Sequence, residues 1–378
     1  MDQPIGLATK KTSDARAAFA VAPWRDFADR AGWDALAANA AEPNPFMERW
    51  CLEAGLAAFD TRDEIALATL TIEGRLAGIL PLVRRWRYEK YPLPHLGTWL
   101  HANAFCGAPL VAVGHEHAFW RELLHWADAH AGRALFLHLE GMPVEGPLYG
   151  ALRDVCTIEH RAAAAVHRLD RALLASGLSP QAYFDASMSG KKRKELRRQH
   201  TRLAEQGVLA FERLTDDTGL AGWIDAFLAL ERAGWKGREG SALACEPAKA
   251  AFFRNALAGA AAHGRLERLA ITLDGEPIAM LANFVTPPGA YSFKTTYDER
   301  FARFSPGVLL QRENLDLLAQ GDIAWADSCA AADHPMIERI WREKRTIARV
   351  SIAIGGPLRR SAAAAIFRAE TRAPGQGL

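Results

Sequence analysis

The stretch Leu266–Asn314 constrains the fold of this chain more than any other. Between Leu269 and Leu273, large apolar residues alternate with Ala and Thr, which is the period of a half-buried strand. Asp274-Gly275 follows, a pair that favours a two-residue hairpin because both residues can take positive φ. Return strands are expected over Ile278–Val285 and Tyr291–Tyr297. The stretch therefore predicts three consecutive antiparallel strands.

A helix start follows the third predicted strand. Ser305-Pro306-Gly307 opens an apolar-patterned segment, and proline is tolerated at the first position of a helix. The first backbone N–H groups of a helix have no intrahelical partner, so such a start can hold a phosphate. The alternative is an ordinary helix start capped by the side chain of Ser305. The sequence leaves both interpretations open.

Three motifs in and around this stretch carry a family resemblance. They are WKGREGSAL at 235–243, YSFKTTYDERFARFSPGVLL at 291–310 and DSCAAADHPMIERIW at 327–341. Together they resemble the GNAT-type acyltransferase domain of proteins associated with bacterial polysaccharide and cellulose biosynthesis, a group related to the Fem-type peptidyltransferases. The resemblance is best over Ser189–Ile354. It implies an α/β fold with mixed α+β sheets, commonly built as two tandem GNAT-like acyltransferase halves.

An internal sequence similarity supports the prediction of two related halves. LTIEGRLAGIL around Glu73-Gly74 aligns with ITLDGEPIAML around Asp274-Gly275, and a helical region precedes each hairpin. A chain of 378 residues also exceeds what one core usually organises. We expect a degenerate GNAT-like half over residues 1–165 that opens with a loose arm of about twenty residues. A GNAT acyltransferase domain over 166–356 and a partly disordered tail over 357–378 are expected to follow.

The composition excludes several classes of protein. Apolar residues make up 49% of the chain, and a net charge of +2 argues against a polyanion as the general partner. Five separated cysteines without CxxC spacing indicate free thiols, and neither a signal peptide nor a membrane span is recognised, so we expect a cytoplasmic protein. HExxH, GxSxG, GxxxxGK[ST] and zinc-type Cys/His clusters are missing, and no metal is expected.

A carboxylate lies on an apolar helix face just before the first motif. In the predicted helix 218–235, Trp223, Phe227 and Leu230 form one face, and Glu231 follows Phe227 by four residues on the same side. Burying a carboxylate is costly unless it is paired or used in chemistry. Glu231 is therefore either a general base or substrate-amine anchor, or a structural residue that pairs with an arginine or caps a turn. Both interpretations stay open.

A strongly basic helix is predicted over Ser179–Gln206. Its motif SGKKRKELRRQHTRL directs only Leu196 and Leu203 clearly inward. The basic face is either a surface for an anionic substrate or cofactor phosphate, or a solvated helix face. Aromatic interleaving of the kind that supports nucleic-acid binding is missing.

Acyl transfer from a thioester needs a pyrophosphate cradle, a donor that polarises the carbonyl, a base for the amine and a proton source for the thiolate. The resemblance implies that acetyl-CoA or another acyl-CoA is the co-substrate and that the third strand and the helix after it contact it. The residues expected to bind this cofactor are Tyr297, Ser305, Gly307 and Val308. The sequence departs from the family's Q/R-x-x-G-x-G/A loop, since only Gly307 of its glycines remains.

The remaining site candidates surround the same strands. Lys294 lies in mid-strand, where it either stabilises an oxyanion or points to solvent. The expected catalytic residues are Glu231, Lys294, Asp298 and His334, although His334 can equally be a solvated or helix-capping histidine. The expected substrate contacts are Trp235, Lys236 and Asp327.

Three functions compete at this stage. The leading one is an acyl-CoA-dependent N-acyltransferase, of the acetyltransferase type, acting on an amine of a small molecule or a sugar or polysaccharide precursor. A Fem-like transferase that uses aminoacyl-tRNA is the second, and the basic helix would then contact the tRNA. The third is a non-catalytic GNAT-fold protein of an exopolysaccharide system, which the missing glycines favour.

Overall fold

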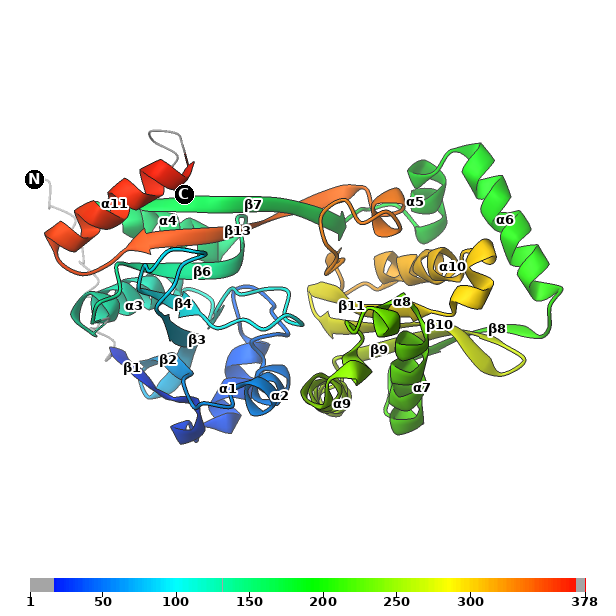
Figure 1. The fold of residues 1–378 in the computed structure, drawn as a ribbon, viewed down its shortest axis with the longest axis horizontal. Coiled ribbons are helices and arrows are strands. Elements are labelled where there is room, and N and C mark those ends of the chain that lie inside the picture. Colours follow the sequence, from blue (N-terminus) through cyan, green and yellow to red (C-terminus); the bar gives the residue numbers. More distant parts are fainter. Residues whose placement is uncertain (1–16, 131, 372–377) are drawn as a thin grey trace, which may run out of the picture.

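The structure, a computed structural model, describes residues 17–130, 132–371 and 378. Two mixed α/β halves lie side by side and are joined by the long strands β7 and β13 that run across the top of the molecule (Figure 1). Within the described residues, all strands belong to one mixed sheet of 13 strands. The α/β class and the division into two halves predicted from the sequence are confirmed.

The first half contains these elements: β1 (Ala17–Pro23), α1 (Arg30–Ala38), α2 (Arg49–Phe59), β2 (Ala66–Ile72), β3 (Arg75–Arg85), β4 (His95–Thr98), β5 (Leu110–Val111), α3 (Glu116–His130), β6 (Phe136–Pro143) and α4 (Pro147–Ile158). The second half contains α5 (Pro180–Ser187), α6 (Gly190–Ala204), β8 (Leu209–Leu214), α7 (Leu220–Ala233), α8 (Trp235–Arg238), α9 (Pro247–Ala262), β9 (Leu266–Leu273), β10 (Glu276–Thr286), β11 (Gly289–Tyr297), α10 (Pro306–Glu313) and β12 (Trp325–Asp327).

Two strands connect the halves. β7 (Ala163–Leu174) and β13 (Glu343–Ala353) pair with each other along almost their whole length. β13 also pairs with β6 of the first half, whereas the end of β7 pairs with β12 of the second. The strand order is therefore β1-β2-β3-β4-β6-β13-β7-β12-β11-β10-β9-β8. The last strand of the first half comes from the end of the chain, so no single cut near residue 165 separates the halves.

The two hairpins that suggested a duplication are equivalent in detail. Glu73-Gly74 and Asp274-Gly275 all have positive φ, as a two-residue hairpin requires. When the turns are superimposed, β2–β3 and β9–β10 have the same register and each skips the corresponding residue, Ala77 in one and Ile278 in the other. Each hairpin also occupies the second and third positions from its edge of the sheet. The predicted equivalence of the hairpins is confirmed.

The second half has an apolar core on each face of its sheet. Leu269, Ile271 and Leu273 of β9 face the core under α5, α6 and α10, while Ala270 faces the other core. The expected half-buried strand is in fact buried along its whole length, because helices cover both faces. The core around α7 and α9 is continuous with that of the first half. The face on which α7 packs is therefore also the face on which the halves meet.

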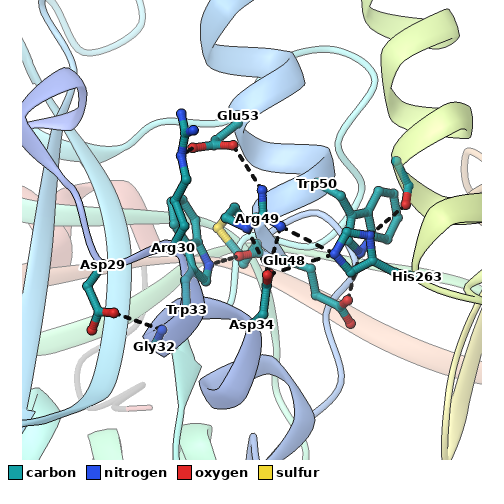
Figure 2. A network of polar contacts seen from close by, with 12 residues as sticks. Asp29, Arg30, Gly32, Trp33, Asp34, Glu48, Arg49, Trp50, Glu53 and His263 are labelled. Carbon is teal, nitrogen blue, oxygen red and sulfur yellow. Dashed lines mark hydrogen bonds and ion pairs between the residues drawn. The ribbon is translucent and has the colours of Figure 1, made fainter.

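Polar contacts within the first half position Arg49 of α2 against His263 at the end of α9. Arg49 of α2 donates hydrogen bonds to both carboxylate oxygens of Asp34, at 2.8 and 2.7 Å, and one of its nitrogens lies 3.3 Å from Nε2 of His263 (Figure 2). Glu48 accepts a hydrogen bond from the indole of Trp50 at 2.8 Å. Phe46 and Trp50 also make aromatic contacts with Phe284 of the second half. Together these contacts predict that the halves move little relative to each other.

The ends of the chain differ from the predictions. The predicted loose arm is wrong from Ala17 on, because Ala17–Pro23 form β1; residues 1–16 lie outside the described residues. The predicted tail is wrong over Pro357–Thr371, which form α11. Its alanines and arginines favour helix, and Ala363 and Phe367, one turn apart, are buried against β7 and β13. The end of the tail, residues 372–377, is likewise outside the described residues.

Candidate active site

A wedge-shaped cleft opens where β11 and β12 separate. The two strands pair in parallel only from Gly289 to Tyr291, because β12 ends at Asp327 while β11 continues to Tyr297. A bulge in the pairing of β11 with β10 leaves out Phe293. Beyond Asp327 the chain turns at Cys329, which has φ of 53°. Because the two strands diverge, the part of β11 after Tyr291 is accessible on the side where β12 no longer pairs with it.

The cleft has a volume of about 580 Å³ and walls from both halves of the molecule. Its lining includes Ser292, Lys294, Thr295 and Tyr297 of β11, Gln311 of α10, Trp235 and Lys236 of α8, Ser328, Cys329, His334 and Met336 after β12, and Phe105 of the first half. Of the predicted site residues, the structure thus brings together Lys294, Tyr297, His334, Trp235 and Lys236.

Lys294 is the cation of the cleft. Its ammonium lies 5.2 Å from the ring centre of Phe105 and 5.6 Å from that of Phe293. No hydrogen-bond or ion-pair partner within the described residues is found for it. Burial, reinforced by the charge of Lys236, lowers the pKa of Lys294 to about 8. A lysine that lacks an anion but faces a cleft can stabilise negative charge that develops on a substrate oxygen.

Glu231 contacts the cleft through Lys236 and also lines a small adjoining cavity of about 40 Å³ with Thr295 and Tyr297. Its buried carboxylate accepts a hydrogen bond from Nζ of Lys236 at 2.8 Å and another from the backbone N–H of Leu243, also at 2.8 Å. Both oxygens are therefore engaged, and they fasten the end of α7 to the segment after α8. This geometry agrees better with a residue that positions Lys236 than with a free base.

His334 lies opposite, on the segment that follows β12. Burial lowers the pKa of its imidazole, so the ring is predominantly neutral at pH 7. Its Nδ1 is buried and without a hydrogen-bond partner within the described residues. A neutral imidazole at the cleft can take a proton from an attacking amine and return it to a leaving group.

The predicted phosphate cradle has little capacity. Pro306, the first residue of α10, has no N–H, and the amides of Ser305 and Val308 already donate to backbone carbonyls. A Cβ built on Gly307 would lie 2.9 Å from the sulfur of Met336 and 3.2 Å from the ring of Tyr297, so these side chains cover the helix start. The side chain of Ser305 makes no capping hydrogen bond. Neither the phosphate cradle nor the capped helix start is therefore formed as the sequence suggested.

Asp298 and Asp327, two further predicted residues, also lie outside the cleft. Asp298 begins the 3-10 helix Glu299–Phe304, and Arg300, through its hydrogen bonds, lowers the pKa of its carboxyl group. Asp298 faces a separate surface groove. Asp327 is fully buried, lies 2.7 Å from Arg171 and 3.2 Å from Arg345, and accepts the N–H of Cys329. Asp327 thus holds the turn at the closed end of the cleft.

Phe105, Gln311 and Cys329 line the cleft but were not among the predicted site residues. Phe105 comes from the first half, and no local pattern links it to β11. Cys329 is within a recognised motif, yet its burial raises the pKa of the thiol well above the ordinary value, which leaves the thiol protonated. Within the described residues, no group of three or more His, Cys, Asp or Glu could hold a metal ion.

Comparison with known proteins identifies the class of the second half. Residues 190–335 match the family described as acetyltransferase (GNAT) domain. This match covers all of α6 to β12 and the cleft residues Ser328, Cys329 and His334, and it ends just before Met336. The protein is an acyltransferase. Substrate and acyl donor do not follow from this match.

Solved structures share the fold of the whole chain. The acyltransferase is similar to FemX, with 10% sequence identity and a TM-score of 0.57, over 89% of this chain and 99% of that one. It is also similar to a conserved protein of unknown function from Bacteroides thetaiotaomicron VPI-5482, with 11% identity and a TM-score of 0.54, over 86% of this chain and 96% of that one. At such identities the likeness shows the fold alone. No curated protein sequence matches the chain.

Proposed function

We propose that the protein transfers an acyl group from an acyl-CoA to an amine of a small molecule or of a sugar or polysaccharide precursor, and that the cleft beside β11 is the site. The observation that carries this proposal is Lys294, a cation without an anionic partner among the described residues, at the point where β11 and β12 separate. The match of this region to the GNAT domain supports the same reaction class.

The chemistry can be divided among the cleft residues. The lone pair of the neutral amine attacks the thioester carbonyl carbon, a C–N bond forms, and the carbonyl electrons move onto oxygen beside the ammonium of Lys294. The proton that the nitrogen must lose passes to the imidazole of His334. The electrons on the oxygen then re-form the C=O bond as the C–S bond breaks, and the departing thiolate takes that proton from the imidazolium. Protons and electrons balance without another reactant.

Lys236 and Trp235 complete the proposed substrate contacts. Glu231 holds the ammonium of Lys236 at one wall, and the half-exposed ring of Trp235 lies at the mouth. Of the residues expected to bind coenzyme A, Tyr297 is part of the cleft, whereas Gly307 and Val308 offer little to a pyrophosphate in the conformation seen. The phosphates of coenzyme A would then depend on basic side chains rather than on the start of α10.

The basic face of α6 favours a second candidate, aminoacyl-tRNA as the donor. α6 carries exposed lysines and arginines and packs against the 3-10 helix that precedes α10, with Gln199 donating to the carbonyl of Arg303. In that reaction an ester C–O bond breaks in place of the C–S bond. The poor phosphate cradle and this adjacent basic surface are the observations that favour it.

A ligand-binding experiment separates the donors. A ligand that binds only the native protein raises its melting temperature by mass action. We expect coenzyme A to raise it and deacylated tRNA to leave it unchanged at 150 mM salt. A shift with tRNA alone would favour the Fem-like reaction, and no shift with either ligand would contradict both proposed donors. Acyl transfer from acetyl-CoA to a panel of amines then tests turnover.

The cellular context is also a proposal. None of the helices in the described part of the chain has the length and hydropathy of a membrane span. All five cysteines are free, which suits a reducing compartment, and we propose the cytoplasm. A role in polysaccharide biosynthesis rests on the motifs at 235–243, 291–310 and 327–341.

A further inference from the structure

The strands at the two edges of the sheet occupy equivalent positions but differ in charge. β1 and β8 are the edge strands, and each pairs with the first strand of a duplicated hairpin. Their registers place Phe19 of β1 and Phe211 of β8 at the same position relative to those hairpins. The next two residues are Ala20 and Val21 in β1 but Glu212 and Arg213 in β8. The duplication therefore offers an internal comparison of the two edges.

Charged residues are a common device by which proteins keep exposed strand edges from pairing with other chains. β8 has this protection: Glu212 is exposed, and Arg213 forms an ion pair with Glu267 at 2.8 Å. β1 consists of Ala17–Pro23 and has no charged residue at all. Its outer edge has no strand partner within the described residues, and its alanines at 18, 20 and 22 are exposed. The uncharged edge is the one able to accept another strand.

We infer that β1 pairs with β1 of a second copy of this chain, antiparallel and centred on Ala20, so that the sheets of two molecules become continuous. The sequence of β1 is self-complementary in this register. Phe19 of each copy lies beside Val21 of the other, on the face where Phe19 already packs against Phe119. On the opposite face Ala20 meets Ala20, and Ala18 meets Ala22. Two apolar layers extend across the axis without an unpaired charge.

A charge at the centre of this pairing tests it. The two-fold axis places residue 20 opposite itself, so Ala20→Glu puts two like charges side by side, which destabilises a strand pair. The variant copies the residue that β8 tolerates at the equivalent position, and the side chain is exposed, so the fold is expected to persist. Ala210→Glu, on the outer strand of the other edge, is the matched control.

Sedimentation velocity of the full chain gives the result. We expect the wild type and Ala210→Glu to sediment with the mass of two chains, and Ala20→Glu with the mass of one at the same concentration. A wild type that is monomeric up to about 100 µM would overturn the inference. A dimer that survives Ala20→Glu, or one lost equally in both variants, would do the same.

A second measurement fixes the register. In a Cys245→Ser background, which removes the exposed native thiol, Ala20→Cys should form an intermolecular disulfide on mild oxidation. Glu212→Cys, at the equivalent position of β8, should stay monomeric on a non-reducing gel. Failure of the residue-20 crosslink, or equal crosslinking at both positions, would contradict pairing centred on Ala20 even if Ala20→Glu cannot be purified.

Discussion

The two halves of this acyltransferase have equivalent hairpins, but the strand that follows the hairpin has different surroundings in each half. In the second half, β11 continues past its partner β12 and leaves a cleft with Lys294 opposite Ala282. In the first half, the position equivalent to Ala282 is Pro81, and its carbonyl accepts the N–H of the buried Trp99. A large apolar side chain thus stands where the second half has its cation.

The chain of the first half also closes the opening itself. After β4 it returns to the end of β6, where the N–H of Gly107 donates to the carbonyl of Gly141 at 2.9 Å. Phe105 of the same loop projects into the cleft of the second half. The first half therefore forms part of the wall of the candidate site in the second half. This supports the proposal that the first half is degenerate as an enzyme.

The largest expected effect is that of Lys294→Met. Removing one group that stabilises an oxyanion costs about 10²–10³-fold in kcat. We expect such a loss in amine-dependent release of coenzyme A from acetyl-CoA, with an unchanged melting temperature. Lys249→Met, which removes a lysine paired with Glu246 on α9, should retain full turnover. Equal losses in both variants would show that Lys294 has no special role.

The pH dependence of kcat tests whether the positive charge of Lys294 is required. Because the pKa of Lys294 is lowered to about 8, its ammonium is lost as the pH rises through that value. We expect wild-type kcat to fall by about tenfold per pH unit above pH 8 relative to Lys294→Arg, whose guanidinium remains charged. The ratio of the two rates cancels titration of the amine substrate. A ratio that is constant from pH 7 to 10 would exclude Lys294 as the essential cation.

Glu231→Gln distinguishes a positioning residue from a base. The amide keeps the shape and can still accept the N–H of Leu243, but it loses the charge that faces Lys236. A hydrogen bond to a charged group contributes about 1.5–3 kcal/mol, which predicts a melting temperature roughly 2–4 °C lower for a chain of this length. Turnover of the folded fraction should change by less than about tenfold. A loss of about 10²–10⁴-fold at unchanged stability would instead identify Glu231 as the general base.

Gly107→Ala tests whether the close approach of the loop after β4 to β6 is required for the stability of the first half. A Cβ at this position would lie 1.9 Å from the backbone carbonyl oxygen of Glu140, so the loop must shift. We expect destabilisation of about 1–3 kcal/mol, measured by urea unfolding. Gly150→Ala is the control, because nothing lies within 4 Å of its Cβ and alanine favours the helix. Equal stability of the two variants would show that the close approach at Gly107 is not required.

Local sequence signals predicted the hairpins, the start of α10 at Pro306 and the helix with Glu231 well. Each depends on a turn pair, a proline at a helix start or a 3.6-residue period, and these act over a few residues. The same signals failed where partners come from far along the chain. β12 is three residues long because its neighbours β7 and β11 diverge, and the sequence near Asp327 gives no sign of this.

The candidate site was predictable only in part, for the same reason. Lys294 was recognisable as a lysine in mid-strand, and Trp235 and Lys236 belonged to a motif. Whether Asp298 faces the cleft or Arg300 depends on the path of the chain after β11, and the contact of Phe105 with Lys294 depends on how two halves pack. Neither is encoded in a local pattern.

Hydrogen exchange with and without acetyl-CoA tests the central claim most directly, because it reports which half holds the donor. The account predicts slower exchange in peptides that cover Ser292–Tyr297 and residues 328–337, with no change over residues 98–107. Protection confined to residues 98–107 and β6, or no protection at any acetyl-CoA concentration up to about 1 mM, would contradict an acyl-CoA site in the cleft of the second half.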